Sequence, residues 1–313
     1  MAEITPRRVW VPFNRSAKDL PEGLVADVFE GTGPIPDSID EVEMFVVPYA
    51  FKNSHPELMA RMPNLKVAQT LTAGFENILP HLPEGVMLCN ARGVHDASTA
   101  ELALTLTLSA LRAIPRYVRQ AERGIWEPAY AAGDKLVDDA LADKTVLIVG
   151  HGAIGQAVER RLAGFEVDVL RVARTARDGV SAFENLPALL PEADVVVLIV
   201  PSTPETRGLV DRGFLARMKD GALLVNVARG VIVDTDALVA ETASGRLRAA
   251  LDVTDPEPLL PDHPLWSIPN VLITPHVGGA STAFLPRALR LIRDQLRRYA
   301  AGEPLENVIT SGY

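Results

Sequence analysis

The stretch that decides the fold is Thr145-Val146-Leu147-Ile148-Val149-Gly150-His151-Gly152-Ala153-Ile154-Gly155. Its first five residues predict a buried parallel strand, and residues 156–162 predict the helix that follows. A second apolar segment, residues 167–172, comes at the spacing of a βαβ unit. The glycines allow a tight turn, a close approach of backbone to a ligand, and close helix–strand packing. With free N–H groups at the helix N-terminus, this unit predicts a site for the pyrophosphate of a dinucleotide.

The end of the second strand bears on which dinucleotide binds. An NAD-binding strand usually ends in Asp or Glu, which binds the ribose 2′-hydroxyl and is expected here about 18 residues after Gly155. Ala173 stands at that position, followed by Arg174 and Thr175, with Arg177 close by. The arginines would also fit a solvated loop. The missing acid and the gained arginine nevertheless favour a 2′-phosphate, so the sequence predicts NADP as the preferred coenzyme over NAD.

Strand and helix patterns alternate along the 313 residues, which predicts an α/β fold with parallel sheets. Strands are expected at 9–12, 44–48, 65–71, 86–90, 145–149, 167–172, 195–200, 222–226, 248–252 and 271–274. Helices are expected at Pro21–Phe29, Pro56–Met62, Ser98–Arg123 and Thr282–Tyr299, and a loop at 127–141. The length suits two domains, between which the chain would cross twice, at hinges near Gly93–Ser98 and Val277–Ala283.

Composition restricts the class of protein. The formal charge of −9 argues against nucleic acid as a partner. No apolar run approaches the roughly 18 residues of a membrane helix, and the first residues lack the apolar core of a signal peptide. Cys89 is the only cysteine, so a reducing compartment fits, and no group of His, Cys, Asp and Glu has metal-binding spacing. We therefore expect a cytoplasmic protein with no metal and no membrane or nucleic-acid partner.

Three charged residues stand in distinctive local sequences, each after a predicted strand of the second domain. The sequences are Asn226-Val227-Ala228-Arg229-Gly230, Asp252-Val253-Thr254-Asp255-Pro256-Glu257-Pro258 and Thr274-Pro275-His276-Val277-Gly278-Gly279. Folds of the α/β class bind ligands outside the carboxyl ends of their strands. A fixed cation can hold a carboxylate and polarise a ketone, while a histidine oriented by a carboxylate gives a proton to the developing alkoxide. These residues therefore favour reduction of a 2-oxo acid.

Each motif also has a plainer interpretation. Arg229 could cap its strand, Glu257 could be a turn residue between two prolines, and His276 could be a loop histidine. The glycine pattern alone fits an ordinary strand–helix turn, in which His151 occupies a variable position without a function. The plainer interpretations weaken when all the motifs occur together in the expected order.

The chain resembles the D-isomer-specific 2-hydroxyacid dehydrogenases, which include glyoxylate/hydroxypyruvate reductases, phosphoglycerate dehydrogenases and formate dehydrogenase. The resemblance covers nearly the whole chain and is strongest from Leu141 to Gly279, through GHGAIG, PSTPETRGLV, NVARG, DVTDPEP and TPHVGG. It implies that Arg229 binds the substrate carboxylate and carbonyl, that His276 is the acid/base with Glu257 as its partner, and that Asp252 lies near the nicotinamide. It also implies two doubly wound parallel-sheet domains: a flavodoxin-like substrate-binding domain (1–95 and 284–313) and a Rossmann dinucleotide-binding domain (96–283).

The predicted contacts follow from the motifs and the resemblance. For the coenzyme they are Gly150, Gly152, Ala153, Ile154, Gly155, Arg174, Thr175, Pro201, Val227, Ala228, Arg229, Asp252, His276 and Gly278. For the substrate they are Ala73, Gly74, Arg229 and His276. The N–H groups of Ala73 and Gly74 follow a predicted strand and precede a segment predicted as helical, residues 76–79, so they could bind a carboxylate. An ordinary turn at Gly74 is the alternative.

The predicted function is reversible, NAD(P)H-dependent reduction of a small 2-oxo acid, of the glyoxylate or hydroxypyruvate type, to the D-2-hydroxy acid. Closure of the two domains would exclude water during the reaction. The alternatives are a phosphoglycerate dehydrogenase without a regulatory domain and a dinucleotide-sensing protein of the corepressor type. The family and the long helix predicted after Ser98 suggest a homodimer.

Overall fold

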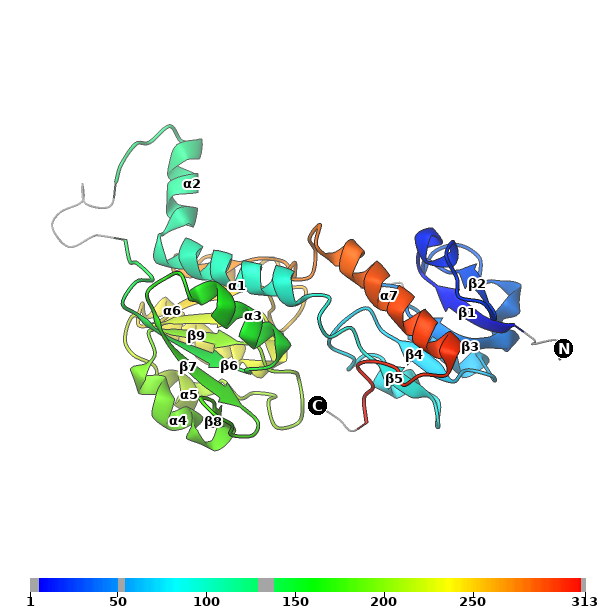
Figure 1. Ribbon diagram of the computed structural model, residues 1–313. Coiled ribbons are helices and arrows are strands. Elements are labelled where there is room, and N and C mark those ends of the chain that lie inside the picture. The colour runs from blue at the N-terminus through cyan, green and yellow to red at the C-terminus, as the bar shows by residue number, and fades with distance from the viewer. Residues whose placement is uncertain (1–5, 50–53, 129–137, 311–313) are drawn as a thin grey trace. The chain divides into compact units, whose positions relative to one another are not determined.

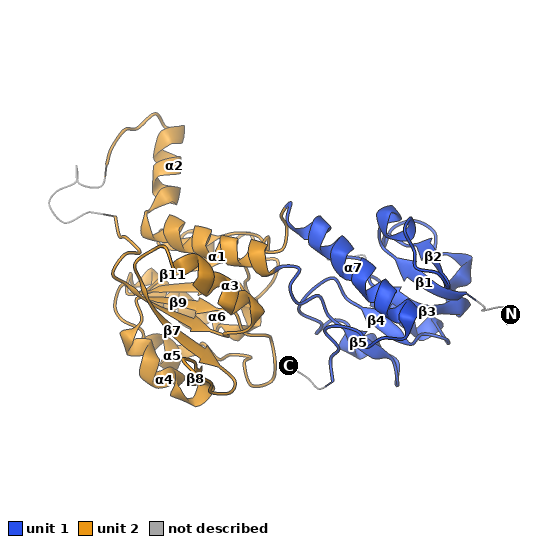
Figure 2. Ribbon diagram, viewed as in Figure 1, with its two compact units in different colours: residues 1–95, 282–313 blue, residues 96–281 orange. Residues whose placement is uncertain are grey.

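The computed structural model describes residues 6–49, 54–128 and 138–310 (Figure 1). The chain divides into two compact units, one formed by residues 1–95 and 282–313 and the other by residues 96–281 (Figure 2). Each unit contains one parallel sheet: five strands in the order β2-β1-β3-β4-β5 in unit 1, and seven in the order β12-β11-β10-β9-β6-β7-β8 in unit 2. The α/β fold class predicted from the sequence is confirmed.

Unit 1 is built on a sheet with the flavodoxin-like strand order. Its strands are β1 (Arg7–Val11), β2 (Leu24–Val28), β3 (Val42–Val46), β4 (Val67–Gln69) and β5 (Met87–Cys89). Its helices are the short 3-10 helices η1 (Asn14–Ala17), η2 (Asp37–Glu41), η3 (Pro56–Arg61) and η4 (Leu79–His81), and the long α7 (Phe284–Ala301). Side chains alternate along β1: Val9 and Val11 pack in a cluster with α7 residues, whereas Trp10 joins the opposite cluster.

Three segments of unit 1 that were predicted as helices differ from that prediction. The segment Pro21–Phe29, predicted as a helix, contains strand β2, which pairs in parallel with β1 over five residues. Its apolar residues fit both periods, and the long-range pairing with β1 decides the outcome. The segment predicted as helical at residues 76–79 is a turn that leads into η4, and the helix expected at Pro56–Met62 is the 3-10 helix η3.

Unit 2 has a sheet between two layers of helices, with buried apolar strands at its centre. The strands are β6 (Thr145–Val149), β7 (Asp168–Ala173), β8 (Ser181–Ala182), β9 (Val195–Leu198), β10 (Leu223–Asn226), β11 (Arg248–Leu251) and β12 (Val271–Ile273). The helices are α1 (Asp96–Leu111), α2 (Ile114–Glu122), α3 (Ala153–Leu162), α4 (Leu186–Leu189), α5 (Arg212–Arg217) and α6 (Thr235–Ala243), with the 3-10 helices η6 (Phe183–Asn185), η7 (Leu190–Glu192), η8 (Gly230–Ile232) and η9 (Pro264–Trp266).

The two faces of this sheet form separate clusters because strand side chains alternate. In β6, Val146 and Ile148 pack with residues of α1 and α3. Leu147 and Val149 pack on the opposite side, in the cluster that contains residues of α5 and α6. Because all the paired strands are parallel, their carboxyl ends share one edge of the sheet, and the loops that follow them lie along that edge.

The long helix predicted for Ser98–Arg123 is two helices, α1 and α2. The break falls at Ala113, which has a left-handed backbone (φ 49°), and Pro115 stands in the first turn of α2. A proline at that place lacks the N–H of a continuing helix, and its ring collides with the carbonyl four residues earlier. Figure 1 shows α2 projecting from the rest of unit 2, and none of its residues is buried. Of the loop predicted at 127–141, residues 129–137 lie outside the described residues.

Candidate active site

The glycine turn between β6 and α3 depends on the lack of side chains at its glycines. Gly150 has a φ of +108°, and a Cβ atom on it would lie 2.6 Å from the carbonyl of Ile199. A Cβ on Gly155 would collide with the carbonyl oxygen of Gly150, so this glycine lets α3 start close to the strand. A Cβ on Gly152 would meet nothing within 4 Å. The backbone before Ala153 is therefore open to a ligand, at a helix N-terminus that favours anions.

The end of β7 lies beside this turn. The N–H groups of Gly150 and His151 both bond to the carbonyl of Val172, each at 2.9 Å. Arg174 follows two residues later and is exposed. The pKa of Glu205 is lowered by a hydrogen bond with Thr203 and by the charge of Arg174, which places Arg174 near the loop after β9. The arginine thus lies where the ribose of a bound dinucleotide is expected.

The other predicted coenzyme contacts follow strands of the same sheet. Pro201 comes after β9, and Val227 and Ala228 come directly after β10. Since β10, β9, β6 and β7 are neighbours in that order, these residues and the glycine turn share the carboxyl edge.

The three predicted catalytic residues also come from adjacent strands. Arg229 follows β10, Glu257 follows β11 and His276 follows β12, and these strands are neighbours in the sheet. The structure brings two of the side chains into contact, since Nδ1 of His276 lies 2.5 Å from Oε1 of Glu257. A carboxylate only accepts hydrogen bonds, so Nδ1 carries the hydrogen of this bond. The opposite nitrogen, Nε2, is then the ring atom that can exchange a proton with a ligand.

Asp252 holds the loop that carries His276. The residue is 3% exposed, and its carboxylate accepts hydrogen bonds from Thr274 Oγ1 (2.6 Å), Val277 N (2.8 Å) and Gly278 N (2.8 Å). Its carbonyl accepts from His276 N at 2.8 Å. His276 has a left-handed backbone (φ 53°), which is uncommon for a residue with a side chain. The family resemblance implied that Asp252 lies near the nicotinamide, which stays a prediction; the structure shows that Asp252 organises this loop.

Asn226 fixes the backbone of Arg229. The buried amide of Asn226 donates to the carbonyl of Arg229 at 3.0 Å and accepts from Ala228 N at 3.0 Å. Gly230 packs so closely that a Cβ on it would collide with the carbonyl of Thr254. Sequence reasoning gave Asn226 no separate function, although an asparagine that bonds to backbone two residues later is a frequent turn former. The guanidinium of Arg229 bonds to the carbonyl of Ala228 at 2.7 Å.

Unit 1 contains the predicted carboxylate contacts, Ala73 and Gly74, in the turn after β4. Their carbonyls are bound by Asn90 Nδ2 (2.8 Å) and by the hydroxyl of Thr72 (2.5 Å) respectively. Within the described part of the chain, the N–H groups of Ala73 and Gly74 have no hydrogen-bond acceptor. These two N–H groups can therefore receive an anion.

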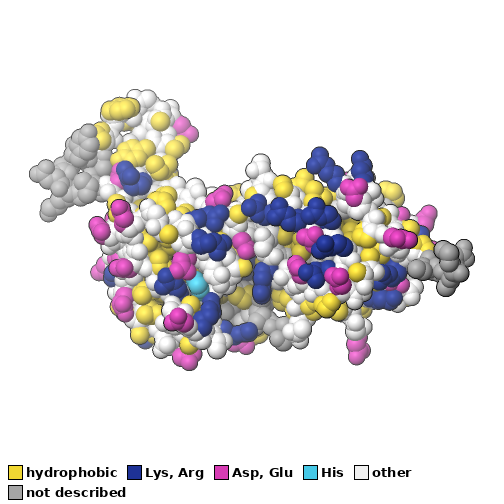
Figure 3. Space-filling model, viewed as in Figure 1, with side chains coloured by type: hydrophobic (Ala, Val, Ile, Leu, Met, Phe, Trp, Pro, Cys, Tyr) yellow, Lys and Arg dark blue, Asp and Glu magenta, His cyan; other side chains and the backbone are white. Residues whose placement is uncertain are grey.

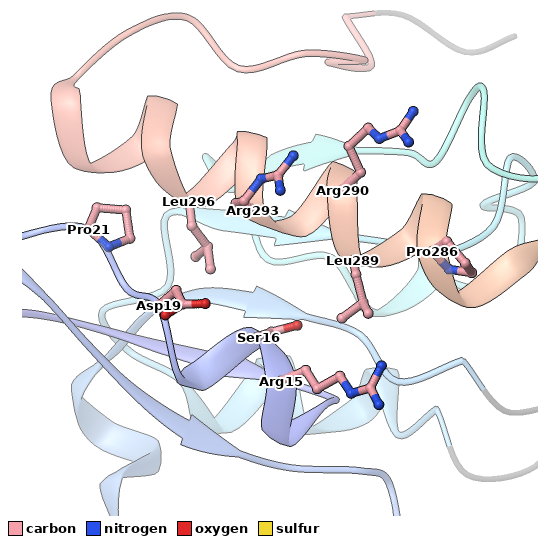
Figure 4. Close-up of a pocket in the computed structure, with 9 residues that line it drawn as sticks. All are labelled: Arg15, Ser16, Asp19, Pro21, Pro286, Leu289, Arg290, Arg293 and Leu296. Atoms are coloured by element: carbon pink, nitrogen blue, oxygen red, sulfur yellow. The ribbon is translucent and has the colours of Figure 1, made fainter.

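A separate groove of about 290 Å³ lies in unit 1 between η1 and α7. It is lined by arginines and apolar side chains, among them Arg15, Arg290, Arg293 and Leu289 (Figure 4). None of the predicted site residues lines it. Over the ranges that the structure describes, no group of three or more His, Cys, Asp or Glu could hold a metal ion, and no helix is long and apolar enough to cross a membrane.

Residues 104–278 match the model of a protein family described as D-isomer specific 2-hydroxyacid dehydrogenase, NAD binding domain. The chain belongs to this family. The match confirms the resemblance drawn from the motifs, and it makes the protein an NAD(P)-dependent oxidoreductase.

Individual relatives are similar over most of the chain. A human glyoxylate reductase/hydroxypyruvate reductase is 35% identical over 254 residues, which cover 77% of this chain and 76% of that protein. A D-3-phosphoglycerate dehydrogenase from Archaeoglobus fulgidus is 34% identical over 262 residues, which cover 81% of this chain and 49% of that protein. The chain thus spans about half the length of this second relative.

Among solved structures, a D-isomer specific 2-hydroxyacid dehydrogenase from Xanthobacter autotrophicus Py2, in complex with NADPH and MES, has a TM-score of 0.79 and 32% sequence identity. The similarity covers 97% of this chain and 98% of that one. The two-sheet architecture is therefore shared over nearly the whole length.

Proposed function

We propose that this protein reduces a small 2-oxo acid, of the glyoxylate or hydroxypyruvate type, to the D-2-hydroxy acid, with NADPH as the preferred coenzyme. The observation that carries the proposal is the contact of His276 with Glu257 at 2.5 Å, on loops of the sheet edge that also carries Arg229 and the glycine turn. The human relative named as a glyoxylate and hydroxypyruvate reductase supports the choice of substrate.

The chemistry assigned to each side chain follows from its donors and acceptors. NADPH, when bound, supplies the hydride. Arg229 binds the substrate carboxylate and polarises the ketone, because its planar guanidinium can contact both oxygens at once. His276 holds a proton at Nε2 and gives it to the carbonyl oxygen as negative charge develops there. Glu257 accepts from Nδ1, which fixes the ring and stabilises the protonated form of the histidine.

The two units have different proposed tasks. Unit 2 holds the coenzyme through Gly150, Gly152 and Gly155, where the turn accommodates a pyrophosphate. Unit 1 contributes the N–H groups of Ala73 and Gly74 for the substrate carboxylate, and the lack of a protein acceptor for these groups among the described residues supports this role.

The preference for NADPH depends on the end of β7. A carboxylate there would repel a 2′-phosphate, but the strand ends in Ala173 and is followed by the exposed Arg174. The NADPH complex of the Xanthobacter relative supports the same choice. A hydrogen bond to a charged group contributes about 1.5–3 kcal/mol, so Arg174→Ala should weaken NADPH binding by about 10- to 100-fold and leave NADH binding nearly unchanged.

A second candidate substrate is 3-phosphohydroxypyruvate, because the Archaeoglobus relative is named as a phosphoglycerate dehydrogenase. The two candidates differ by a phosphate group on the substrate. Steady-state kinetics with glyoxylate, hydroxypyruvate and 3-phosphohydroxypyruvate, each with NADPH and NADH, would separate them. Coenzyme binding without turnover of any of these substrates would refute the proposal and would favour a binding protein of the corepressor type.

The catalytic assignment has its own test. Replacing His276 by Ala should lower kcat about 100-fold or more, which is the usual contribution of a positioned general acid. Glu257→Gln should move the alkaline limit of ketone reduction to lower pH, because the imidazolium loses its charged partner. An unchanged pH profile in the glutamine variant would remove Glu257 from this role.

We also propose that the protein is a homodimer that associates through α2. Figure 3 shows hydrophobic side chains gathered on this projecting helix, where Val118 is 52% exposed and Ile114 is 47% exposed. An exposed apolar face of this kind usually marks an interface between proteins. Val118→Glu should yield a monomer in light scattering, whereas Leu79→Glu, at a comparably exposed position of unit 1, should leave the mass unchanged.

A further inference from the structure

His151, in the glycine turn, is a buried bridge between two elements. Its side chain packs between α3 and the segment after β7, and the residue is 8% exposed. Nε2 lies 2.5 Å from Oε2 of Glu159 on α3. Nδ1 lies 3.0 Å from Nη2 of Arg177, which follows β7. The ring therefore connects the helix that begins at the pyrophosphate site with the segment that follows the second strand.

The two partners determine the protonation of the ring. A guanidinium only donates, so Nδ1 accepts from Arg177; a carboxylate only accepts, so Nε2 donates its hydrogen to Glu159. His151 in this arrangement is neutral, with its hydrogen on Nε2. Glu159 is ionised, because hydrogen bonds from Arg171 and then from His151 lower the pKa of its carboxyl group. Arg171 donates to Glu159 through both Nε (2.7 Å) and Nη2.

Arg177 is held at both its backbone and its side chain. Its N–H and carbonyl exchange hydrogen bonds with Val180, at 3.1 and 2.9 Å, across a tight turn. Its Nη2 also donates to the carbonyl of His151. The segment from Arg174 to Ala176 is therefore fixed at both ends: at Val172, which binds the glycine turn, and at Arg177, which binds His151.

We infer that His151 is a positioning residue for recognition of the ribose 2′-phosphate, acting through Arg177 on the segment that carries Arg174. This inference rests on the NADPH preference proposed above and extends it. The 2′-phosphate of the coenzyme would contact Arg174 and Arg177, and His151 would fix the distance between these two arginines. NADH, which lacks the phosphate, would gain little from that arrangement.

The test measures dissociation constants of the full chain for NADPH and NADH by fluorescence titration. His151→Leu removes both ring contacts and should weaken NADPH binding about 10-fold, with NADH changed less than about 2-fold. His151→Asn retains an acceptor near the position of Nδ1, so it should restore most of the NADPH affinity. Arg177→Ala should weaken NADPH binding, and combining it with His151→Leu should add little, since the two residues act through one contact.

The asparagine variant also serves if the leucine variant does not fold. Because it keeps an acceptor for Arg177, it should keep the preference for NADPH, and loss of that preference would contradict the role given to the acceptor atom.

The outcomes separate this inference from the proposal on which it rests. Equal affinity of the wild type for both coenzymes would refute the NADPH preference itself. A wild-type preference for NADPH that survives in His151→Leu would overturn the role of His151 alone.

Discussion

Replacing Asp252 by Asn tests whether one buried carboxylate organises the loop that carries His276. Asparagine has nearly the same shape, but it can keep an oxygen on only one side. If the asparagine oxygen faces Thr274 and Val277, the amide nitrogen faces the N–H of Gly278. Both of these groups are donors, so no hydrogen bond forms between them. The substitution therefore removes hydrogen bonds without opening a cavity.

The magnitude follows from the three bonds. The buried N–H of Gly278 loses its acceptor, which costs about 1–3 kcal/mol, and the other two bonds lose their charge assistance, at about 1 kcal/mol each. The free energy of unfolding should fall by about 3–5 kcal/mol, a large share of the 5–15 kcal/mol typical of a domain. Because His276 N bonds to the carbonyl of the same residue, kcat should also fall about 10-fold or more.

Urea unfolding followed by circular dichroism measures the stability, and steady-state reduction of the oxo acid measures kcat. Asp255→Asn is the matched control, because Asp255 is exposed and lies three positions after Asp252 in the segment that follows β11. The control should change the free energy of unfolding by less than about 0.5 kcal/mol. If Asp252→Asn behaved like this control, the loop would be held by something other than the carboxylate, and the reasoning would fail.

Three further predictions follow from the geometry. Gly152→Ala should fold with an unchanged Tm but bind NADPH at least about 10-fold more weakly in fluorescence titration, whereas Gly155→Ala should lower the Tm itself, because only the second Cβ meets the protein. Arg229→Lys keeps the charge but loses the planar fork, so KM for the oxo acid should rise and kcat should fall while the Kd for NADPH stays the same; normal kinetics would make Arg229 structural. The folded-state pKa of Glu159 is lowered, so the carboxylate stabilises the fold above its ordinary pKa of 4.5, and this contribution is lost as pH falls through the lowered value. The Tm of Glu159→Gln should therefore fall less than the Tm of the wild type between about pH 6 and about pH 3.5. Parallel Tm profiles would contradict this.

The parts of the fold that were predictable are those with local causes. The continuous apolar run at 145–149 is strand β6, and the glycines after it adopt the turn that their spacing requires. β2 was not predictable in this way, because its residues fit helix and strand alike and its pairing with β1 joins distant segments. The break between α1 and α2 does have a local cause, Pro115, so two helices were predictable from the sequence at this point.

The candidate site likewise contains some contacts that were predictable from the sequence and others that were not. Glu257 and His276 were predicted partners, and their side chains are in contact in the structure. The bonds of Asp252 to Val277 and Gly278, and the bridge from His151 to Arg177, join residues 25 and 26 positions apart. Such bonds depend on how loops pack after the sheet has formed. They cannot be derived from periodicity or motif spacing.

The proposed tasks fall on separate loops of the carboxyl edge of the unit 2 sheet: phosphate binding after β6, coenzyme choice after β7, and the chemistry after β10, β11 and β12. Such an edge is modular. The segment of residues 174–177 begins after Val172 and ends at Arg177, both of which contact the glycine turn, so it could be exchanged as a unit while the loops after the other strands keep their sequences. The coenzyme preference can thus change, in evolution or by design, while the proposed catalytic residues stay the same.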